Sequence, residues 1–126
     1  TLLQQRQQGK PIAYITGHRE FWSRDFEVNS NVLIPRPDTE LLIELSLSHL
    51  ADKPKARIID LGTGSGAIAI TLAAERPDIE VIASDLSHNA LALAEDNANK
   101  HQIKNIHFIN KVINIYMQLV IFYLLI

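Results

Sequence analysis

One stretch, residues 57–70, constrains the fold of this chain more than any other. It has the sequence RIIDLGTGSGAIAI, in which a short apolar run leads into three alternating glycines and then into an alanine- and isoleucine-rich segment. The apolar run is typical of a buried strand, and the segment from Ala67 onward is typical of a helix. Glycines between the two allow a ligand to approach the backbone N–H groups at the helix start. The stretch therefore predicts the first half of a nucleotide-binding βαβ unit.

A second strand and an acidic residue follow at the spacing that such a unit requires. Residues 80–84 are mostly apolar and end at Asp85, which lies 19 residues after Gly66. At about 20 residues, an acidic side chain in such folds accepts hydrogen bonds from ribose hydroxyls. Asp85 could instead be only a turn or N-cap residue, a role that Ser87 could also supply. The complete strand, glycine turn, helix, strand and Asp context favours the ligand role.

The rest of the chain predicts an α/β fold with an open parallel sheet. The predicted strands lie near 58–61, 80–84 and 106–109, the helices near 38–50, 66–76 and 87–101, and a hairpin near 20–29 with its turn at 23–25. Asp38 or Thr39 is expected to cap the first of these helices, and Ser87 the last. The leucines and isoleucine of 41–50 are expected to be largely buried. Residues 1–9 resemble the end of a helix that stops at Gly9.

Composition excludes several classes of function. The 126 residues are enough for one domain or part of one, and they contain no cysteine, which rules out disulfides and thiolate metal sites. The five histidines lack the spacing of metal ligands, so no metal is expected. A net charge of −2 gives no reason to expect direct nucleic-acid binding. No secretory signal is visible, and a cytoplasmic location is expected.

Four motifs together resemble one enzyme family. They are PIAYITGHREFW at 11–22, LIPRPDTE at 33–40, DLGTGSGAIAI at 60–70, and Asp85. Their combination resembles the release-factor glutamine N5-methyltransferases, the HemK/PrmC family, over about residues 2–109. The glycine motif is common to many methyltransferases, whereas IPRPDTE is the specific part. In particular, the PDTE that follows IPR favours the release-factor branch over the related ribosomal-protein enzymes.

The resemblance implies a Rossmann-like class I methyltransferase fold that uses S-adenosylmethionine. It divides the chain into the end of an N-terminal helical domain with its linker (1–17), a β-hairpin linker (18–34) and a partial methyltransferase domain with an incomplete parallel sheet (35–109). Its substrate would be the glutamine of a Gly-Gly-Gln loop in a peptide-chain release factor. The implied cofactor-binding residues are Gly62, Thr63, Gly64, Ser65, Gly66 and Asp85, the last accepting both ribose hydroxyls. The candidates for lining the active site are Pro35, Arg36, Pro37, Thr39 and Glu40. Arg36 is either a partner contact or a member of a structural ion pair.

Two family motifs are absent from the sequence. An Asp-Trp pair that helps to hold adenine should follow the third strand, where this chain has Lys111-Val112-Ile113, and the substrate-holding Asn-Pro-Pro-Tyr occurs nowhere. No catalytic residue is therefore assigned, and the chain alone is expected to be inactive. The alternatives are a non-catalytic, truncated remnant or cofactor-binding module, and a fragment of an NAD-dependent oxidoreductase, because residues 62–67 also fit a loose G-x-G-x-x-A.

Residues 110–126 have a different composition from the rest. Charge disappears after Lys111, and the 15 residues from Val112 to Ile126 are mostly apolar. A spanning helix needs about 20 apolar residues, so no membrane anchor is expected. A buried fourth strand or helix is one interpretation, because strands of parallel sheets are often continuous apolar runs. We favour the interpretation that the tail is sequence foreign to the family, such as the product of a shifted reading frame or a mis-assigned gene end. The sequence predicts no oligomeric state.

Overall fold

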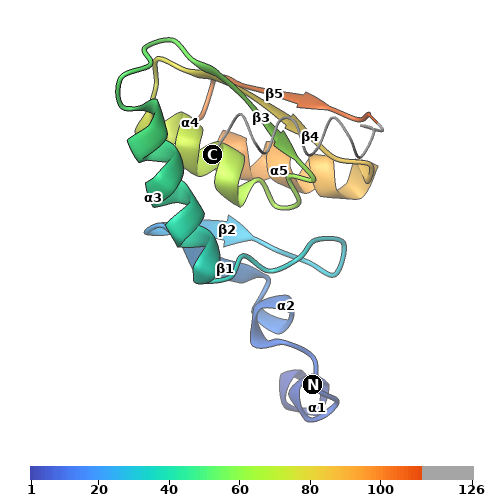
Figure 1. The fold of residues 1–126 in the computed structure, drawn as a ribbon. Coiled ribbons are helices and arrows are strands. Elements are labelled where there is room, and N and C mark those ends of the chain that lie inside the picture. The colour runs from blue at the N-terminus through green and yellow to red at the C-terminus, as the bar shows by residue number, and fades with distance from the viewer. Residues whose placement is uncertain (112–126) are drawn as a thin grey trace.

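The computed structural model describes residues 1–111 (Figure 1). The prediction about the tail therefore falls almost entirely outside the described residues. In the described part, a parallel sheet with helices against it forms one body, and a β-hairpin lies between this body and two short N-terminal helices (Figure 1).

The parallel sheet has the strands that the sequence predicts. They are β3 (Arg57–Leu61), β4 (Glu80–Ser84) and β5 (Ile106–Ile109), arranged in the order β3-β4-β5. Both neighbouring pairs are parallel, with Ile58 opposite Val81 and Val81 opposite Ile106. The carboxyl ends of β3 and β4 therefore lie side by side, which brings the glycine turn next to Asp85.

Three longer helices accompany the sheet: α3 (Asp38–Leu50), α4 (Ala67–Glu75) and α5 (His88–Lys100). The Ser87 cap is confirmed, since its hydroxyl accepts a hydrogen bond from Ala90 N at 3.1 Å. The cap predicted for α3 is wrong: Pro37 occupies the N-cap position and no side chain caps the helix, because Asp38 is already helical.

The burial predicted for the apolar residues of α3 is only partly correct. Ile43 and Leu50 are buried, but Leu41 is 58% exposed and Leu45 is 54% exposed. The two lie four residues apart, so they share one face of the helix. In the described part of the chain, α3 buries one face against α4 and leaves the leucine pair open to solvent.

The hairpin consists of β1 (His18–Phe21) and β2 (Arg24–Glu27), which pair antiparallel. Its turn is at Trp22-Ser23, one residue before the predicted position, and both residues have positive φ, at 50° and 61°. Such two-residue turns usually contain Asn-Gly or Asp-Gly, and Trp-Ser lacks that signature, so the prediction misplaced the turn.

Two short helices precede the hairpin. The first, α1 (Leu2–Gln7), is the helix end predicted from the sequence, and the second, α2 (Ile12–Thr16), was not predicted. The second helix contains only five residues, mostly β-branched or aromatic, which is a composition typical of strands. It ends at Gly17, whose φ of 81° is the left-handed conformation of a helix terminus.

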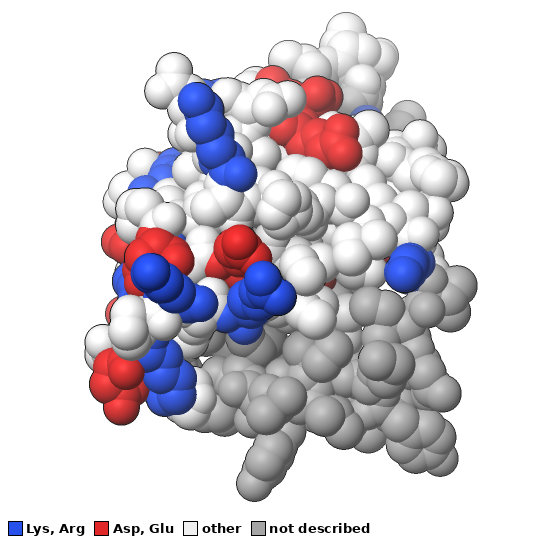
Figure 2. Space-filling model, turned by 90° about the horizontal axis from the view of Figure 1, so that it is seen from above, with Lys and Arg blue, Asp and Glu red and all other residues white. Residues whose placement is uncertain are grey.

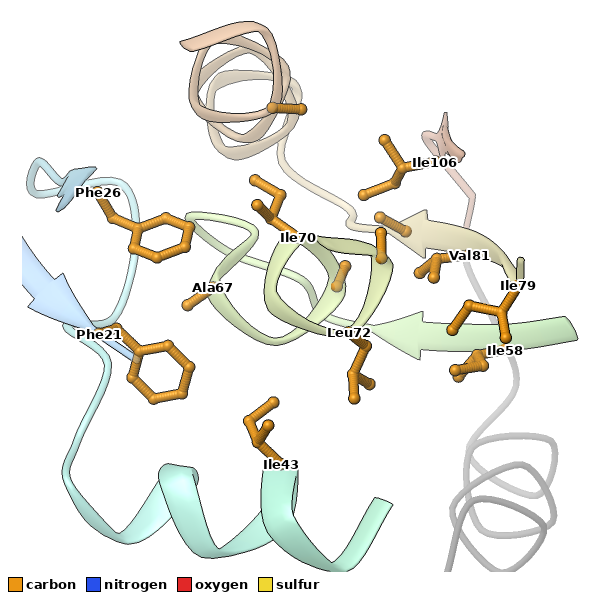
Figure 3. Close-up of a cluster of buried hydrophobic side chains, with 14 of the residues drawn as sticks. Phe21, Phe26, Ile43, Ile58, Ala67, Ile70, Leu72, Ile79, Val81 and Ile106 are labelled. Carbon is orange, nitrogen blue, oxygen red and sulfur yellow. The ribbon is translucent and has the colours of Figure 1, made fainter. Parts of the chain in front are cut away.

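The hydrophobic core joins the hairpin to the sheet (Figure 3). Phe21 and Phe26 extend from the two hairpin strands toward Ala67 of α4 and Ile43 of α3, and their rings meet edge to face with centroids 6.2 Å apart. Further along the same cluster, α4 contributes Ile70 and Leu72. The sheet contributes Ile58, Val81 and Ile106, and Ile79 lies directly before β4. The hairpin is thus part of the core and not a loose linker.

The surface carries both signs of charge. On the face shown in Figure 2, acidic and basic side chains lie near one another, and no single basic patch dominates it. No helix within residues 1–111 is both long enough and apolar enough to span a bilayer.

Candidate cofactor site

The glycine loop is held by its own backbone against the end of β4. Gly62 N and Thr63 N both donate to the carbonyl of Ser84, at 2.8 and 2.9 Å, and Gly66 N donates to Thr63 O at 2.8 Å. The three glycines have φ values of 71°, 57° and 85°, which L-residues rarely adopt. The sequence places glycine where the loop requires it.

Two of the glycines leave open space, and the third permits close packing. A Cβ added at Gly62 would meet nothing within 4 Å, and one at Gly64 would come no closer than 3.9 Å to Val32 Cβ. At Gly66 it would lie 2.8 Å from Ile70 Cδ1 and 3.2 Å from Ala94 Cβ. The loop therefore presents bare backbone on one side and packs against α4 and α5 on the other. Such an opening at the ends of two parallel strands fits a nucleoside cofactor.

Asp85 lies directly against this loop. Its Oδ2 accepts a hydrogen bond from Gly64 N at 3.0 Å, and its Oδ1 accepts one from Ser87 N at 2.9 Å. The turn role considered for this residue is therefore present. Each carboxylate oxygen can accept a further bond, so the same side chain still has capacity for ligand hydroxyls.

Asp60 is a member of the site that the sequence analysis did not assign. It ends the apolar part of β3, and its Oδ2 accepts a hydrogen bond from the Thr63 hydroxyl at 2.7 Å. Burial raises the pKa of this carboxyl to about 6; the Thr63 hydrogen bond lowers it, while the charge of Asp85 raises it further. An isolated acid within an apolar strand is the sequence signal that could have identified it.

Thr63 and Ser65 are buried, at 7% and 3% exposed. The Thr63 hydroxyl is taken up by Asp60, and the Ser65 carbonyl accepts a hydrogen bond from Asn97 Nδ2 at 2.8 Å. Asn97 itself was not predicted, although it is a polar residue on the same face of α5 as Ala90 and Ala94. A polar residue on the buried face of an amphipathic helix was the sequence signal that could have identified it.

The candidate residues for lining the active site, at positions 35–40, differ from one another in exposure, and one of them contacts the hairpin turn. Pro35 is buried, Arg36 and Pro37 are exposed, and Thr39 and Glu40 are partly exposed. Glu40 Oε1 accepts a hydrogen bond from Trp22 N at 3.1 Å, so this carboxylate is held at the hairpin turn. An open cavity of about 310 Å³ lies there, lined by Glu20, Trp22, Ser23 and Glu40. Val32, just before the IPRPDTE motif, approaches the loop, since its Cβ would lie 3.9 Å from a Cβ added at Gly64.

Metal ligands do not gather within residues 1–111: no three histidine, aspartate or glutamate side chains there lie where they could share an ion.

Solved structures with a similar arrangement include methyltransferases. A ribosomal protein L11 methylase from Lactobacillus delbrueckii subsp. bulgaricus superposes with a TM-score of 0.51 at 30% identity, over 60% of this chain and 38% of that protein. A precorrin-6y C5,15-methyltransferase from Geobacter metallireducens GS-15 superposes with a TM-score of 0.56 at 15% identity, over 68% and 44%. The fold is that of class I methyltransferases, as predicted.

A family model narrows the assignment. The Methyltransferase small domain matches residues 38–120, and the chain belongs to this family, whose methyl donor is S-adenosylmethionine. Curated relatives named release factor glutamine methyltransferase include those of Escherichia coli K12 (55% identical over 108 residues) and Neisseria gonorrhoeae (57% over 97 residues). These matches cover 86% and 77% of this chain but only 39% and 35% of the relatives. The resemblance predicted from the motifs is confirmed, and the chain spans less than two fifths of those relatives' length.

Proposed function

We propose that this chain carries the cofactor-binding part of a protein-glutamine N5-methyltransferase that uses S-adenosylmethionine and acts on the Gly-Gly-Gln loop of a release factor. The main observation behind the proposal is the glycine loop, whose Gly64 N donates a hydrogen bond to Asp85, in a chain that is 55% identical over 108 residues to a release factor glutamine methyltransferase. A release-factor substrate also implies that the reaction takes place in the cytoplasm.

Each part of the site has a role in this proposal. The cofactor supplies a methyl group bonded to a positively charged sulfur. The open backbone at Gly62 and Gly64 would lie against it, and the Asp85 carboxylate would accept hydrogen bonds from its ribose hydroxyls. Asp85 is already oriented by two backbone amides, so little side-chain entropy would be lost when it binds the ribose.

Methyl transfer requires more than cofactor binding, because a neutral amide nitrogen is a poor nucleophile and must be held in position. Holding the amide and the methyl group in line can contribute about 7–11 kcal/mol to lowering the barrier. The Asn-Pro-Pro-Tyr motif that would hold the substrate amide is missing from the 126 residues. That observation favours a second candidate function for the chain on its own: cofactor binding without methyl transfer.

Titration calorimetry on the 126-residue chain tests cofactor binding. We expect S-adenosylhomocysteine to bind and NAD not to bind. Asp85→Ala should abolish binding, and Asp85→Asn should weaken it, because the amide keeps an acceptor but loses the charge. Asp96→Ala, which removes an exposed acid from α5, is the matched control and should bind like the unmodified chain. Binding of NAD alone would overturn the assignment.

A methyl-transfer assay separates the two candidate functions. Radiolabelled S-adenosylmethionine, the chain and a release factor with an intact Gly-Gly-Gln loop should give no labelled protein, while calorimetry still detects the cofactor. A release factor whose loop glutamine is replaced by alanine controls for background labelling. Label that depends on the glutamine would show that this chain is catalytically complete.

A further inference from the structure

Asn97 is a fully buried polar side chain in the second half of α5. It is 0% exposed, and it uses all of its hydrogen-bonding groups except one acceptor lone pair. Its Nδ2 donates to Ser65 O at 2.8 Å and to Glu27 O at 3.0 Å, and its Oδ1 accepts from Glu27 N at 2.8 Å. One side chain thus joins three backbone groups from two segments that are far apart in the sequence.

The contact to Glu27 imitates the pairing of a neighbouring strand. Val28 N donates to Gly17 O on the β1 side of the hairpin, and successive backbone groups along a strand point to opposite sides. The N–H and C=O of Glu27 therefore point away from β1, where Asn97 meets both with one amide. An aspartate in this place would keep the acceptor and lose both donors, and a glutamine would be one methylene too long.

The contact to Ser65 reaches the glycine loop one residue after the Gly64 N–H that Asp85 holds. Ser65 lies between Gly64, whose N–H is held by Asp85, and Gly66, which packs closely against Ala94 of the same helix. Ala94 and Asn97 are three residues apart on one helix face. The helix α5 therefore holds the loop by a close apolar contact and by one hydrogen bond, and the same asparagine holds the hairpin.

We propose that Asn97 is a positioning residue that couples the hairpin to the cofactor loop, so that ordering of the loop by the cofactor also orders the hairpin. The inference rests on the proposed function in one respect, the identity of the ligand that orders the loop. The coupling itself concerns this chain's own backbone, and it can be measured with and without ligand.

Hydrogen exchange followed by NMR tests the coupling without any ligand. Asn97→Asp should speed the exchange of both the Glu27 amide and the Gly66 amide, whereas Asn99→Asp, an exposed change on the same helix, should alter neither. Faster exchange in only one of the two segments would overturn the proposal. Asn97→Ser, which can donate to a single carbonyl, is the milder variant if the aspartate variant does not fold.

The unmodified chain provides a second readout that needs no variant. The Nδ2 protons of Asn97 should exchange slowly, and on addition of S-adenosylhomocysteine their resonances should shift while hairpin amides around Glu27 become more protected. Asn97→Asp should weaken S-adenosylhomocysteine binding about tenfold, a usual size for coupling between sites, and abolish the hairpin response. Binding that leaves the hairpin unchanged in the unmodified chain would overturn the proposal. If S-adenosylhomocysteine does not bind at all, the proposed function fails, and the ligand-free exchange still decides the coupling.

Discussion

The β-hairpin is attached to the methyltransferase domain at its base and at its turn, and the two attachments are built differently. At the base, Phe26 is 0% exposed and Glu27 exchanges two hydrogen bonds with the buried Asn97. At the turn, Trp22 N donates to Glu40 beside an open cavity, and Arg24 Nη1 lies 3.2 Å from Glu75 Oε1 with both side chains partly exposed.

The difference shows which attachment determines how the hairpin lies. Where water can replace a partner, a hydrogen bond or ion pair contributes little net stability, about 0–1 kcal/mol for exposed pairs. Where a partner is buried, its loss leaves polar groups without water and costs about 1–3 kcal/mol. Among the polar contacts, those at the base therefore hold the hairpin most firmly against the glycine loop, and those at the turn can be lost at low cost. At the turn the hairpin is held instead by apolar packing, because Phe21 is 2% exposed and Trp22 packs against the core.

Phe26→Ala should have the largest effect. Removing this buried ring should lower the free energy of unfolding by about 3–5 kcal/mol, measured by urea denaturation. Leu33→Ala is the control: Leu33 is 86% exposed, so its truncation should change stability by no more than about 0.5 kcal/mol. A Phe26 variant as stable as the Leu33 variant would show that the base does not hold the hairpin.

Comparing the variants Gly66→Ala and Gly17→Ala separates the cost of overpacking from the cost of backbone strain. Both glycines have similar positive φ, 85° and 81°, but a Cβ at Gly17 would meet nothing within 4 Å, whereas one at Gly66 would crowd Ile70 and Ala94. Both variants carry the strain, and Gly66→Ala should cost about 1–3 kcal/mol more because of overpacking. Thermal unfolding of the two variants measures the difference, and equal losses would mean that the loop does not pack closely on α4 and α5.

The pH dependence of stability should distinguish the desolvated carboxylate of Asp60 from exposed carboxylates. Burial raises the pKa of Asp60 to about 6 from its usual 3.8. The folded state therefore holds this proton more tightly than the unfolded state, and the stability that it contributes is lost as the pH rises from about 4 through 6.

Relative to Asp60→Asn, the unmodified chain should therefore become less stable from pH 4.5 to 7, by about 1–2 kcal/mol. Asp25 of the hairpin is the contrast, because the Lys100 hydrogen bond lowers its pKa. Its contribution should be present at neutral pH and decline only in acid. Urea denaturation midpoints of the unmodified chain and of Asp60→Asn, measured over this pH range, test the prediction. A difference in stability between the two that does not change with pH would contradict the desolvation of Asp60.

Glu40→Gln should have the smallest effect. The amide can still accept from Trp22 N, so the free energy of unfolding should change by less than about 1 kcal/mol, and Glu40→Ala should cost about 0.5–1.5 kcal/mol. Exposed Glu44→Ala, one turn further along α3, is the control. A loss as large as that of Phe26→Ala would reverse the comparison between base and turn.

Local patterns predicted the structure around the candidate site to the extent that its parts are adjacent in sequence. The strands, α4, α5 and the glycine loop follow from apolar periodicity and from glycines at positions where φ is positive. The spacing to Asp85 follows from the length of one βαβ unit. Trp22-Ser23 and α2 were missed, because neither has the composition usual for its conformation. The exposure of Leu41 and Leu45 was missed because periodicity alone does not show which faces of a helix find a partner.

By itself, the sequence determined the class of fold, the family and the residues of the glycine loop. The fold class and the loop depend on one βαβ unit of about 30 residues, and the family depends on short motifs that are each continuous in the sequence. Only the tertiary structure decided that Asp60 is desolvated, that Glu40 serves the hairpin turn, and that Asn97 joins Glu27 to Ser65. These contacts link residues 18 to 70 positions apart or depend on burial. No local pattern specifies which distant backbone group an amide or a carboxylate will meet, because that partner is set by the packing of whole elements.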